Sequence, residues 1–287
     1  MKCERRICSV FHAEHTKAFA KLTEKNYQMK NLEFIAQQLY TAEIEKQTIP
    51  PIRTEFTNER NIEAAYEIQQ LVTQKKIAKG AKLVGKKIGL TSFAVQEQLG
   101  VDEPDFGVLT KTMQIENHEK IDFKNLMQPK AEAEWAFVLK ENIEADQITL
   151  NDVKNTIDYA VVAIEIVGSR IKNWDIKITD TIADNASASH FVLGSKKIDL
   201  SKIDMVNCEM KMFKSDSLIS EGTGQACMGN PLKAVLWLAQ TMQKFKQPLQ
   251  AGEIILSGAL GPMTEIGKGD KLRASIDDFD VVEFEAV

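Results

Sequence analysis

One stretch constrains the fold more than any other: the segment Lys130–Leu139, which reads KAEAEWAFVL. Its two glutamates, Glu132 and Glu134, are two residues apart, so on a β-strand both carboxylates point to the same face. The rest of the segment is apolar, with Trp135 and Phe137 on the opposite face, which is typical of a strand that is buried on both sides. Two like charges side by side in a buried strand repel each other and lose hydration. The segment therefore predicts a buried strand whose glutamates require a cation.

A third carboxylate lies in the next strongly apolar segment. Glu165 interrupts the β-branched run Tyr159–Val167, and a single glutamate in a buried strand is rare unless it is paired. Ligand sets made only of oxygen favour Mg²⁺ or Mn²⁺ over Zn²⁺. Octahedral Mg²⁺ with three protein oxygens keeps three positions, which a bidentate 2-oxo acid and one water would fill. The alternative is that Glu132 and Glu134 face solvent on an edge strand and that Glu165 forms an isolated ion pair.

Composition narrows the class of protein. The chain has 287 residues, of which 44% are hydrophobic and 27% are charged, as in a globular protein with one large domain or a domain plus a smaller lobe. The net charge is −5, and no basic face with interleaved aromatic residues occurs, so nucleic acid is not an expected partner. No run approaches the roughly 20 apolar residues that a membrane-spanning helix needs.

The first 28 residues differ from the rest. They are basic, have no apolar segment of signal-peptide length, and are interpreted as a disordered or atypical extension before Met29. A zinc site built from Cys3, Cys8, His12 and His15 is the alternative, although their spacing matches no common structural zinc pattern. We expect a reduced, cytoplasmic protein, because the chain shows no export signal.

The remaining pattern predicts an α+β fold with a strand-rich core. Helical periodicity at 31–39 and at about 59–79 predicts an N-terminal helical lobe over 29–80, followed by a metal-binding catalytic domain over 81–287. Three further helices are expected at 93–99, 149–157 and 232–245, a loop at 100–107, and irregular structure at 176–182. Strands are expected at 83–90, 108–113, 130–139, 159–167, 191–193, 205–213, 253–257 and 270–286.

Several short motifs occur in a fixed order, and they carry a resemblance to a known family. The motifs are KKIGLTS at 86–92, GVDEPDFG at 100–107, EAE at 132–134, IEIV at 164–167, DTIADNA at 180–186, GNP at 229–231 and LSGAL at 256–260. This set resembles the hydratase/decarboxylase branch of the fumarylacetoacetate hydrolase superfamily, over the region from about Met29 to the C-terminus. The resemblance implies a mixed β-sandwich or roll that holds a divalent metal.

The resemblance also implies roles for individual residues. Glu132, Glu134 and Glu165 match the metal ligands, and Lys87 and Asp105 match the acid–base pair of the family. Asn185, Ser187 and Ser257 lie in loops that match the substrate-binding loops. Taken alone, Lys87 reads as one surface lysine among several, and Asp105 as a turn residue.

The chain departs from the family pattern at two positions. Lys130 stands where the family often has arginine, and Gly168 stands where it often has aspartate. Neither is an expected ligand, so the implied metal site is unaffected, whereas the fit of the substrate is open to change. A nucleophilic triad is not expected, because His118 and His190 have no serine or cysteine partner pattern. The hydrolytic members use a His–Glu pair in an N-terminal segment, and no histidine occurs between 31 and 109.

The expected activity is that of a lyase dependent on Mg²⁺ or Mn²⁺. It would add water to 2-hydroxypenta-2,4-dienoate and give 4-hydroxy-2-oxopentanoate, in the catabolism of aromatic compounds. Decarboxylation of 4-oxalocrotonate is the alternative within the same branch, and a non-catalytic subunit of a hydratase/decarboxylase complex is the alternative of another class. The resemblance further implies a homo-oligomer, a pentamer or a decamer.

Overall fold

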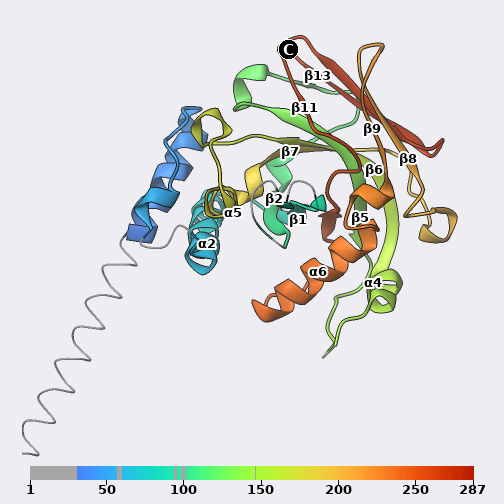
Figure 1. Cartoon of the computed structure of the whole chain (residues 1–287), viewed down its shortest axis with the longest axis horizontal. Coiled ribbons are helices and arrows are strands. Elements are labelled where there is room, and N and C mark those ends of the chain that lie inside the picture. Colours follow the sequence, from blue (N-terminus) through green and yellow to red (C-terminus); the bar gives the residue numbers. More distant parts are fainter. Residues whose placement is uncertain (1–30, 57–59, 94–95, 98–100, 102, 146) are drawn as a thin grey trace, which may run out of the picture.

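The computed structural model describes residues 31–56, 60–93, 96–97, 101, 103–145 and 147–287. The predicted extension at 1–28, with its alternative zinc site, lies outside the described residues. The described part is built from two β-sheets and a few helices (Figure 1). The fold is therefore α+β and strand-rich, as the sequence predicts.

The larger sheet has eight strands in the order β2-β1-β10-β5-β6-β7-β3, and β11 also pairs with β5. Its strands are β1 (Leu83–Gly89), β2 (Asp105–Thr110), β3 (Gln114–Ile115), β5 (Lys130–Leu139), β6 (Ile157–Val167), β7 (Ala188–Leu193), β10 (Ile254–Leu256) and β11 (Thr264–Glu265). The central pair, β5 and β6, is antiparallel and comes from the two most apolar segments of the sequence. The segment with the two glutamates is thus an interior strand, and the alternative of an exposed edge strand is wrong.

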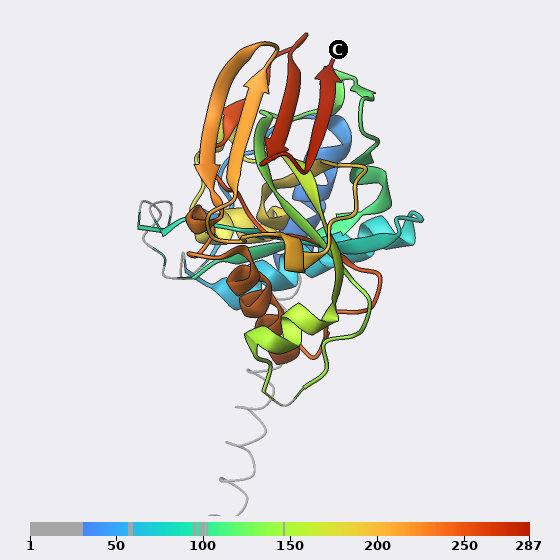
Figure 2. The ribbon, with the colours of Figure 1, turned by 90° about the vertical axis from the view of Figure 1, so that its right-hand side faces the viewer.

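The second sheet has five strands in the order β4-β13-β12-β8-β9. Its strands are β4 (Lys120–Ile121), β8 (Glu209–Lys214), β9 (Ser217–Thr223), β12 (Lys271–Ile276) and β13 (Asp280–Ala286). In Figure 2 the orange and red strands of this sheet form a layer at the top. The main core lies between the sheets, where Trp135 of β5 and Ile166 of β6 join the same buried cluster as Met212, Leu272 and Phe284. This packing leaves the opposite face of β5, with its glutamates, free to form the site.

Helices cover the remaining surfaces. They are a helix at 31–45, α2 (Ile62–Ala78), α4 (Leu150–Thr156), α5 (Ile178–Ala183) and α6 (Pro231–Lys244). Asn230 caps α6 by accepting a hydrogen bond from the Leu232 amide at 2.9 Å, with Pro231 in the first turn, as its sequence predicts. Among the described residues, no helix is long and apolar enough to cross a membrane.

The two N-terminal helices pack on α5, which brings the DTIADNA segment against them (Figure 1). Ile35 of the first helix, Ile68 of α2 and Ile182 of α5 belong to one buried cluster that is separate from the main core. Arg53 adds a polar connection, since its guanidinium lies 2.8 Å from Asp180 of α5. The N-terminal helices thereby support a segment that reaches the site.

Four local predictions are wrong. The segment 100–107 is not a loop throughout, because β2 begins at Asp105, where Gly89↔Asp105 is the last pair of the β1–β2 ladder. The segment 176–182 is not irregular: α5 spans Ile178–Ala183, and the Asp180 carboxylate accepts from the Lys177 amide at 2.9 Å. The strand expected at 205–213 begins only at Glu209, and the strand expected at 108–113 ends at Thr110, because Lys111–Met113 form a 3-10 helix. The first error arises because pairing with β1 makes a strand of residues that read as turn formers. The second arises because α5 is too short to show a helical period in its sequence.

Candidate metal centre and active site

The candidate metal centre is built on the paired strands β5 and β6. Glu132 lies directly opposite Glu165 in the antiparallel ladder, and Glu134, two residues along β5, shares their face. One carboxylate oxygen from each of the three lies within 4.8 Å of the others. The two strands therefore bring together the three predicted carboxylates.

All three carboxylates are buried, and burial shifts the pKa values of Glu134 and Glu165. Glu134 and Glu165 are 0% exposed and Glu132 is 6% exposed. Burial raises the pKa of Glu134 well above its usual range, and repulsion from Glu165 and Glu132 adds to the effect. Burial likewise raises the pKa of Glu165, against the opposing charge of Lys87. A centre of this kind is under electrostatic stress until a cation or protons neutralise it.

The donor atoms fit a hard divalent cation. Glu134 Oε1 and Glu165 Oε2 are buried and have no hydrogen-bond partner within the described protein, and Glu165 Oε1 has only its ion pair with Lys87. Unpaired buried oxygens are costly, and oxygen-only sets suit Mg²⁺, Mn²⁺ or Ca²⁺. Glu134 Oε2 accepts from the Gly258 amide, which orients this carboxylate with its other oxygen free. The three glutamates are thus arranged as ligands for such a cation.

Lys87 is the positive charge beside the carboxylates. It lies on β1 and is only 2% exposed, so the reading of a surface lysine is wrong. Its Nζ lies 3.2 Å from Glu165 Oε1 and donates to the Ala186 carbonyl at 3.0 Å. Burial by itself would lower the pKa of Lys87. The surrounding carboxylates, of which Glu165 has the largest effect, outweigh burial and raise this pKa.

Asp105 lies next to Lys87 at the start of β2. It is 1% exposed; its Oδ2 accepts from the Thr181 hydroxyl at 3.2 Å, and its Oδ1 has no partner within the described protein. Any Cβ at Gly89 would overlap Asp105 Oδ1 and lie 3.4 Å from Lys87 Nζ. Gly89, which has no side chain, therefore leaves space next to both groups. Burial raises the pKa of Asp105, against the opposing effects of Lys87 and the Thr181 hydroxyl.

A tight strap from Asp184 to Ser187 reaches the centre, where the Ala186 carbonyl accepts from Lys87 Nζ. Asn185, Ala186 and Ser187 all have positive φ, of 57°, 50° and 55°, which is unusual for side chains with a Cβ. The strap is held from outside by Arg170, which forms a buried ion pair with the Asp184 carboxylate and donates to the Gly168 carbonyl at 2.7 Å. These contacts hold the Ala186 carbonyl where Lys87 reaches it.

The three predicted substrate-binding residues are placed differently from one another. The hydroxyl of Ser187 is buried and has no partner in the described part of the chain, so it is available. The hydroxyl of Ser257, directly after β10, donates to the Gly258 carbonyl at 3.2 Å. The amide of Asn185 is engaged at both ends by the backbone of Val108, at 2.7 and 2.9 Å. Asn185 thus connects the strap to β2.

The two departures from the family pattern lie beside the centre. Lys130 Nζ lies 4.8 Å from the centroid of the Trp174 ring, a cation–π contact. A Cβ at Gly168 would come within 2.8 Å of the Met127 carbonyl oxygen and 3.3 Å of Ser189 Cβ. A side chain at position 168 would therefore require the backbone around Met127 to move.

Two supporting residues were missed by the sequence analysis. Thr181 belongs to a quoted motif, but nothing in the sequence shows that its hydroxyl reaches Asp105. Gln69 is buried and donates to the carbonyls of Phe106 at 2.9 Å and Ile182 at 2.8 Å, which links α2 to β2 and α5. A polar residue on the apolar side of a helix was the available signal for Gln69.

Two curated proteins are similar to most of this chain. The 2-keto-4-pentenoate hydratase 1 of Dechloromonas aromatica (strain RCB) is 45% identical over 252 residues, covering 88% of this chain and 95% of that protein. The 2-keto-4-pentenoate hydratase of Paraburkholderia xenovorans (strain LB400) is 47% identical over 253 residues, covering 88% and 94%. No protein-family model matches the chain.

Solved structures show the same fold. The 4-oxalocrotonate decarboxylase from Pseudomonas putida G7, complexed with magnesium and adipate, superposes with a TM-score of 0.87 at 28% identity and covers 90% of this chain and 98% of its own. A fumarylacetoacetate hydrolase family protein from Yersinia pestis CO92 shares the fold at 14% identity, with a TM-score of 0.54 over 71% of this chain and 93% of its own. Because it is more than 40% identical to these hydratases over most of its length, this chain belongs to the 2-keto-4-pentenoate hydratase family.

Proposed function

We propose that the protein is a divalent-metal-dependent hydratase that converts 2-hydroxypenta-2,4-dienoate and water into 4-hydroxy-2-oxopentanoate. The observation that carries the proposal is the buried set of Glu132, Glu134 and Glu165 with Lys87 and Asp105 beside it. The relatives named 2-keto-4-pentenoate hydratase support the choice of substrate, because they are 45–47% identical, against 28% for the decarboxylase.

The three glutamates would hold Mg²⁺ or Mn²⁺. When bound, such a cation supplies Lewis-acid polarisation of the carboxylate and 2-oxo oxygens of the substrate. The crystallised decarboxylase contains magnesium, which supports the choice of metal. The protein's part is to hold three carboxylates aligned in a buried strand pair, where Lys87 alone cannot neutralise them.

Lys87 and Asp105 form the proposed acid–base pair. In the reaction the 2-hydroxyl group loses its proton and carbon 5 gains one, after which water adds its hydroxide to carbon 4 and its proton to carbon 3, so one group must remove protons and another must donate them. Lys87 Nζ can donate hydrogen bonds. Asp105 Oδ1, which lies beside Gly89 and has no partner in the described part of the chain, can accept one. Lys87 and Asp105 would therefore divide these proton transfers between them.

The serines are the proposed contacts to the substrate carboxylate and to water. Ser187 offers an unused buried hydroxyl, and Ser257 lies next to the Gly258 amide that orients Glu134. Asn185, whose amide is engaged with Val108, is proposed to shape the strap and not to bind substrate directly. We further propose that 29–80 form a helical lobe, that 81–287 form the catalytic domain, and that the protein is a homo-oligomer. Light scattering on the purified protein tests the oligomeric state.

The decisive experiment offers both candidate substrates to the Mg²⁺-loaded protein. With 2-hydroxypenta-2,4-dienoate we expect loss of the diene absorbance and formation of 4-hydroxy-2-oxopentanoate. With 4-oxalocrotonate we expect little release of CO₂. Release of CO₂ without hydration would establish the decarboxylase instead. No turnover of either substrate by metal-loaded protein would favour a non-catalytic subunit.

A further inference from the structure

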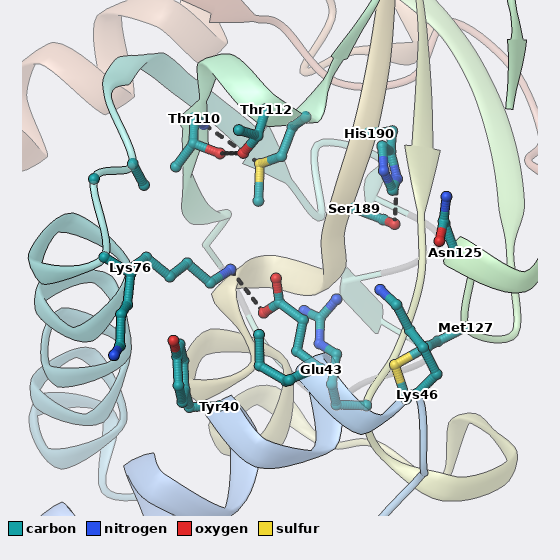
Figure 3. A pocket seen from close by; sticks show the side chains of 16 residues that line it. Tyr40, Glu43, Lys46, Lys76, Thr110, Thr112, Asn125, Met127, Ser189 and His190 are labelled. Atoms are coloured by element: carbon teal, nitrogen blue, oxygen red, sulfur yellow. Dashed lines mark hydrogen bonds and ion pairs between the residues drawn. The ribbon is translucent and has the colours of Figure 1, made fainter. Parts of the chain in front are cut away.

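A second cavity lies away from the metal centre (Figure 3). It has a volume of about 310 Å³, within the range of about 300–1,000 Å³ that is usual for small-molecule sites. Its walls come from the helix at 31–45, the end of α2, the turn after β2 and the start of β7. The polar lining residues are Tyr40, Glu43, Lys46, Lys76, Lys79, Thr110, Thr112, Asn125, Arg170, Ser189 and His190.

This cavity is distinct from the metal centre. None of the three glutamates, nor Lys87 or Asp105, lines it. In β7, Phe191 pairs with Glu165, whereas His190 pairs with Ile166 and so points to the opposite face of the sheet. A ligand in this cavity would not contact the groups of the proposed reaction.

The lining is strongly cationic. Four cationic side chains line the cavity and Glu43 is the one carboxylate among the lining residues. Lys76 forms an ion pair with the Glu43 carboxylate at 2.7 Å, and Arg170 forms an ion pair with Asp184, which does not line the cavity. Within the described part of the chain, Lys46 and Lys79 have no carboxylate at ion-pair distance. In Figure 3, Lys76 and Lys46 reach in from opposite sides with Glu43 between them.

The excess positive charge contributes to lowering the pKa values of His190 and Lys46. Burial, with Lys46, Arg170 and Lys76 adding to it against Glu43, lowers the pKa of His190 to about 4. Burial also lowers the pKa of Lys46, with Arg170 and Lys76 adding to the effect. His190 is therefore neutral near pH 7, and its Nδ1 is held by the Ser189 hydroxyl at 2.9 Å.

Hydrogen-bond donors surround this positive region. The hydroxyls of Thr110 and Thr112 lie 3.0 Å apart on one wall, and the amide of Asn125 lies on another (Figure 3). Ammonium groups that lack a carboxylate, together with hydroxyl and amide donors in a concave site, are the arrangement that recognises phosphate or carboxylate groups. Two unpaired lysines match a ligand with two negative charges.

We propose that this cavity is a second binding site, for a small doubly charged anion such as phosphate or a short dicarboxylate. Lys46 and Lys79 supply the charge that the anion neutralises. Glu43 limits the affinity, because its carboxylate lies among the same cations. The site binds its ligand independently of the proposed reaction.

Isothermal titration calorimetry on the full, Mg²⁺-loaded chain tests the proposal, with inorganic phosphate and succinate as separate probes at matched ionic strength in chloride. We expect saturable binding of at least one probe in this cavity. The double variant Lys46→Gln with Lys79→Gln should weaken binding by about tenfold or more, and Glu43→Gln should tighten it by about fivefold, as expected for unit charges a few ångströms from the ligand. Binding of phosphate alone identifies the ligand class as phosphate, and binding of succinate alone as dicarboxylate.

The matched control is Lys75→Gln, which removes the same charge from α2 outside the cavity, where Lys75 bonds to Gln37 at 2.9 Å. Its affinity should equal that of the wild type. Because succinate also resembles a ligand of the metal centre, a heat that the double variant leaves unchanged belongs to that centre. The proposal is overturned if neither probe binds saturably, if the double variant binds as the wild type does, or if Lys75→Gln loses as much affinity as the double variant.

Discussion

Glu132 of β5 and Glu165 of β6 lie directly opposite each other in an antiparallel ladder, both buried, with Glu134 on the same face. Like charges in facing positions destabilise a sheet, and burial adds a cost of desolvation for each. The one cation that lies beside them, Lys87, contacts only Glu165 at ion-pair distance among the described residues. The sheet therefore carries an uncompensated negative centre, whose consequences are testable.

Removing one of these carboxylates should have opposite effects on metal binding and on stability. Glu134→Gln should abolish saturable Mn²⁺ binding and the proposed turnover. The same variant, freed of metal with chelator near pH 8, should unfold at a higher temperature than metal-free wild type, because a buried charge and its repulsion from Glu165 and Glu132 are gone. Calorimetry measures both effects.

The control for this variant is Glu221→Gln, which removes the same charge from an exposed position on β9. Its metal binding and thermal midpoint should stay at wild-type values. Wild-type turnover in Glu134→Gln would contradict the assignment of the metal centre.

Loss of Lys87 should separate proton transfer from metal binding. Lys87→Met should lower kcat by about 100-fold to 10,000-fold, the usual contribution of a general acid or base. Affinity for Mn²⁺ should not fall, because a positive charge near the three carboxylates has been removed. Lys86→Met, whose ammonium instead pairs with Glu253 at 2.6 Å, is the matched control and should keep its kcat. A parallel loss of metal affinity in Lys87→Met would show that Lys87 mainly supports the fold of the centre.

The Thr181 hydroxyl should matter through Asp105. Thr181→Val removes the hydrogen bond of 3.2 Å to Asp105 Oδ2 and keeps the shape of the side chain. We expect kcat to fall about tenfold, the effect of one hydrogen bond to a charged group, with little change in KM. Thr181→Ser should restore kcat, since it keeps the hydroxyl. An equal loss in the serine variant would point to packing of the methyl group as the cause.

His190 should make stability depend on pH. Its folded pKa of about 4 lies below the unfolded value of 6.5, so between these values the unfolded chain binds a proton that the folded chain refuses. Stability is therefore fully present above about pH 6.5 and declines as the pH falls towards 4. His190→Gln should lessen the fall in melting temperature between about pH 7 and pH 5. The exposed His118→Gln, measured in the same low-anion buffers, is the control; an unchanged decline in His190→Gln would contradict the prediction.

The sequence by itself determined the parts that depend on local pattern. The two-residue spacing of Glu132 and Glu134 in an apolar run is enough to place both carboxylates on one buried face. Other features also follow from neighbouring residues alone: the cap at Asn230, the alternation in β12 and β13, and the ordered motifs. For these features the side-chain period of a strand or helix acts within a few residues.

Only the tertiary structure decided which distant residues meet. The register of β5 against β6 brings Glu165 opposite Glu132, and pairing of β1 with β2 turns Asp105 from a turn residue into the neighbour of Lys87. Gln69 and Thr181 acquire their contacts only when α2 and α5 pack together. The cationic cavity likewise exists only where the helix at 31–45 meets β7. Each depends on long-range packing that minimises unpaired buried polar groups, a condition on the whole chain and not on any segment.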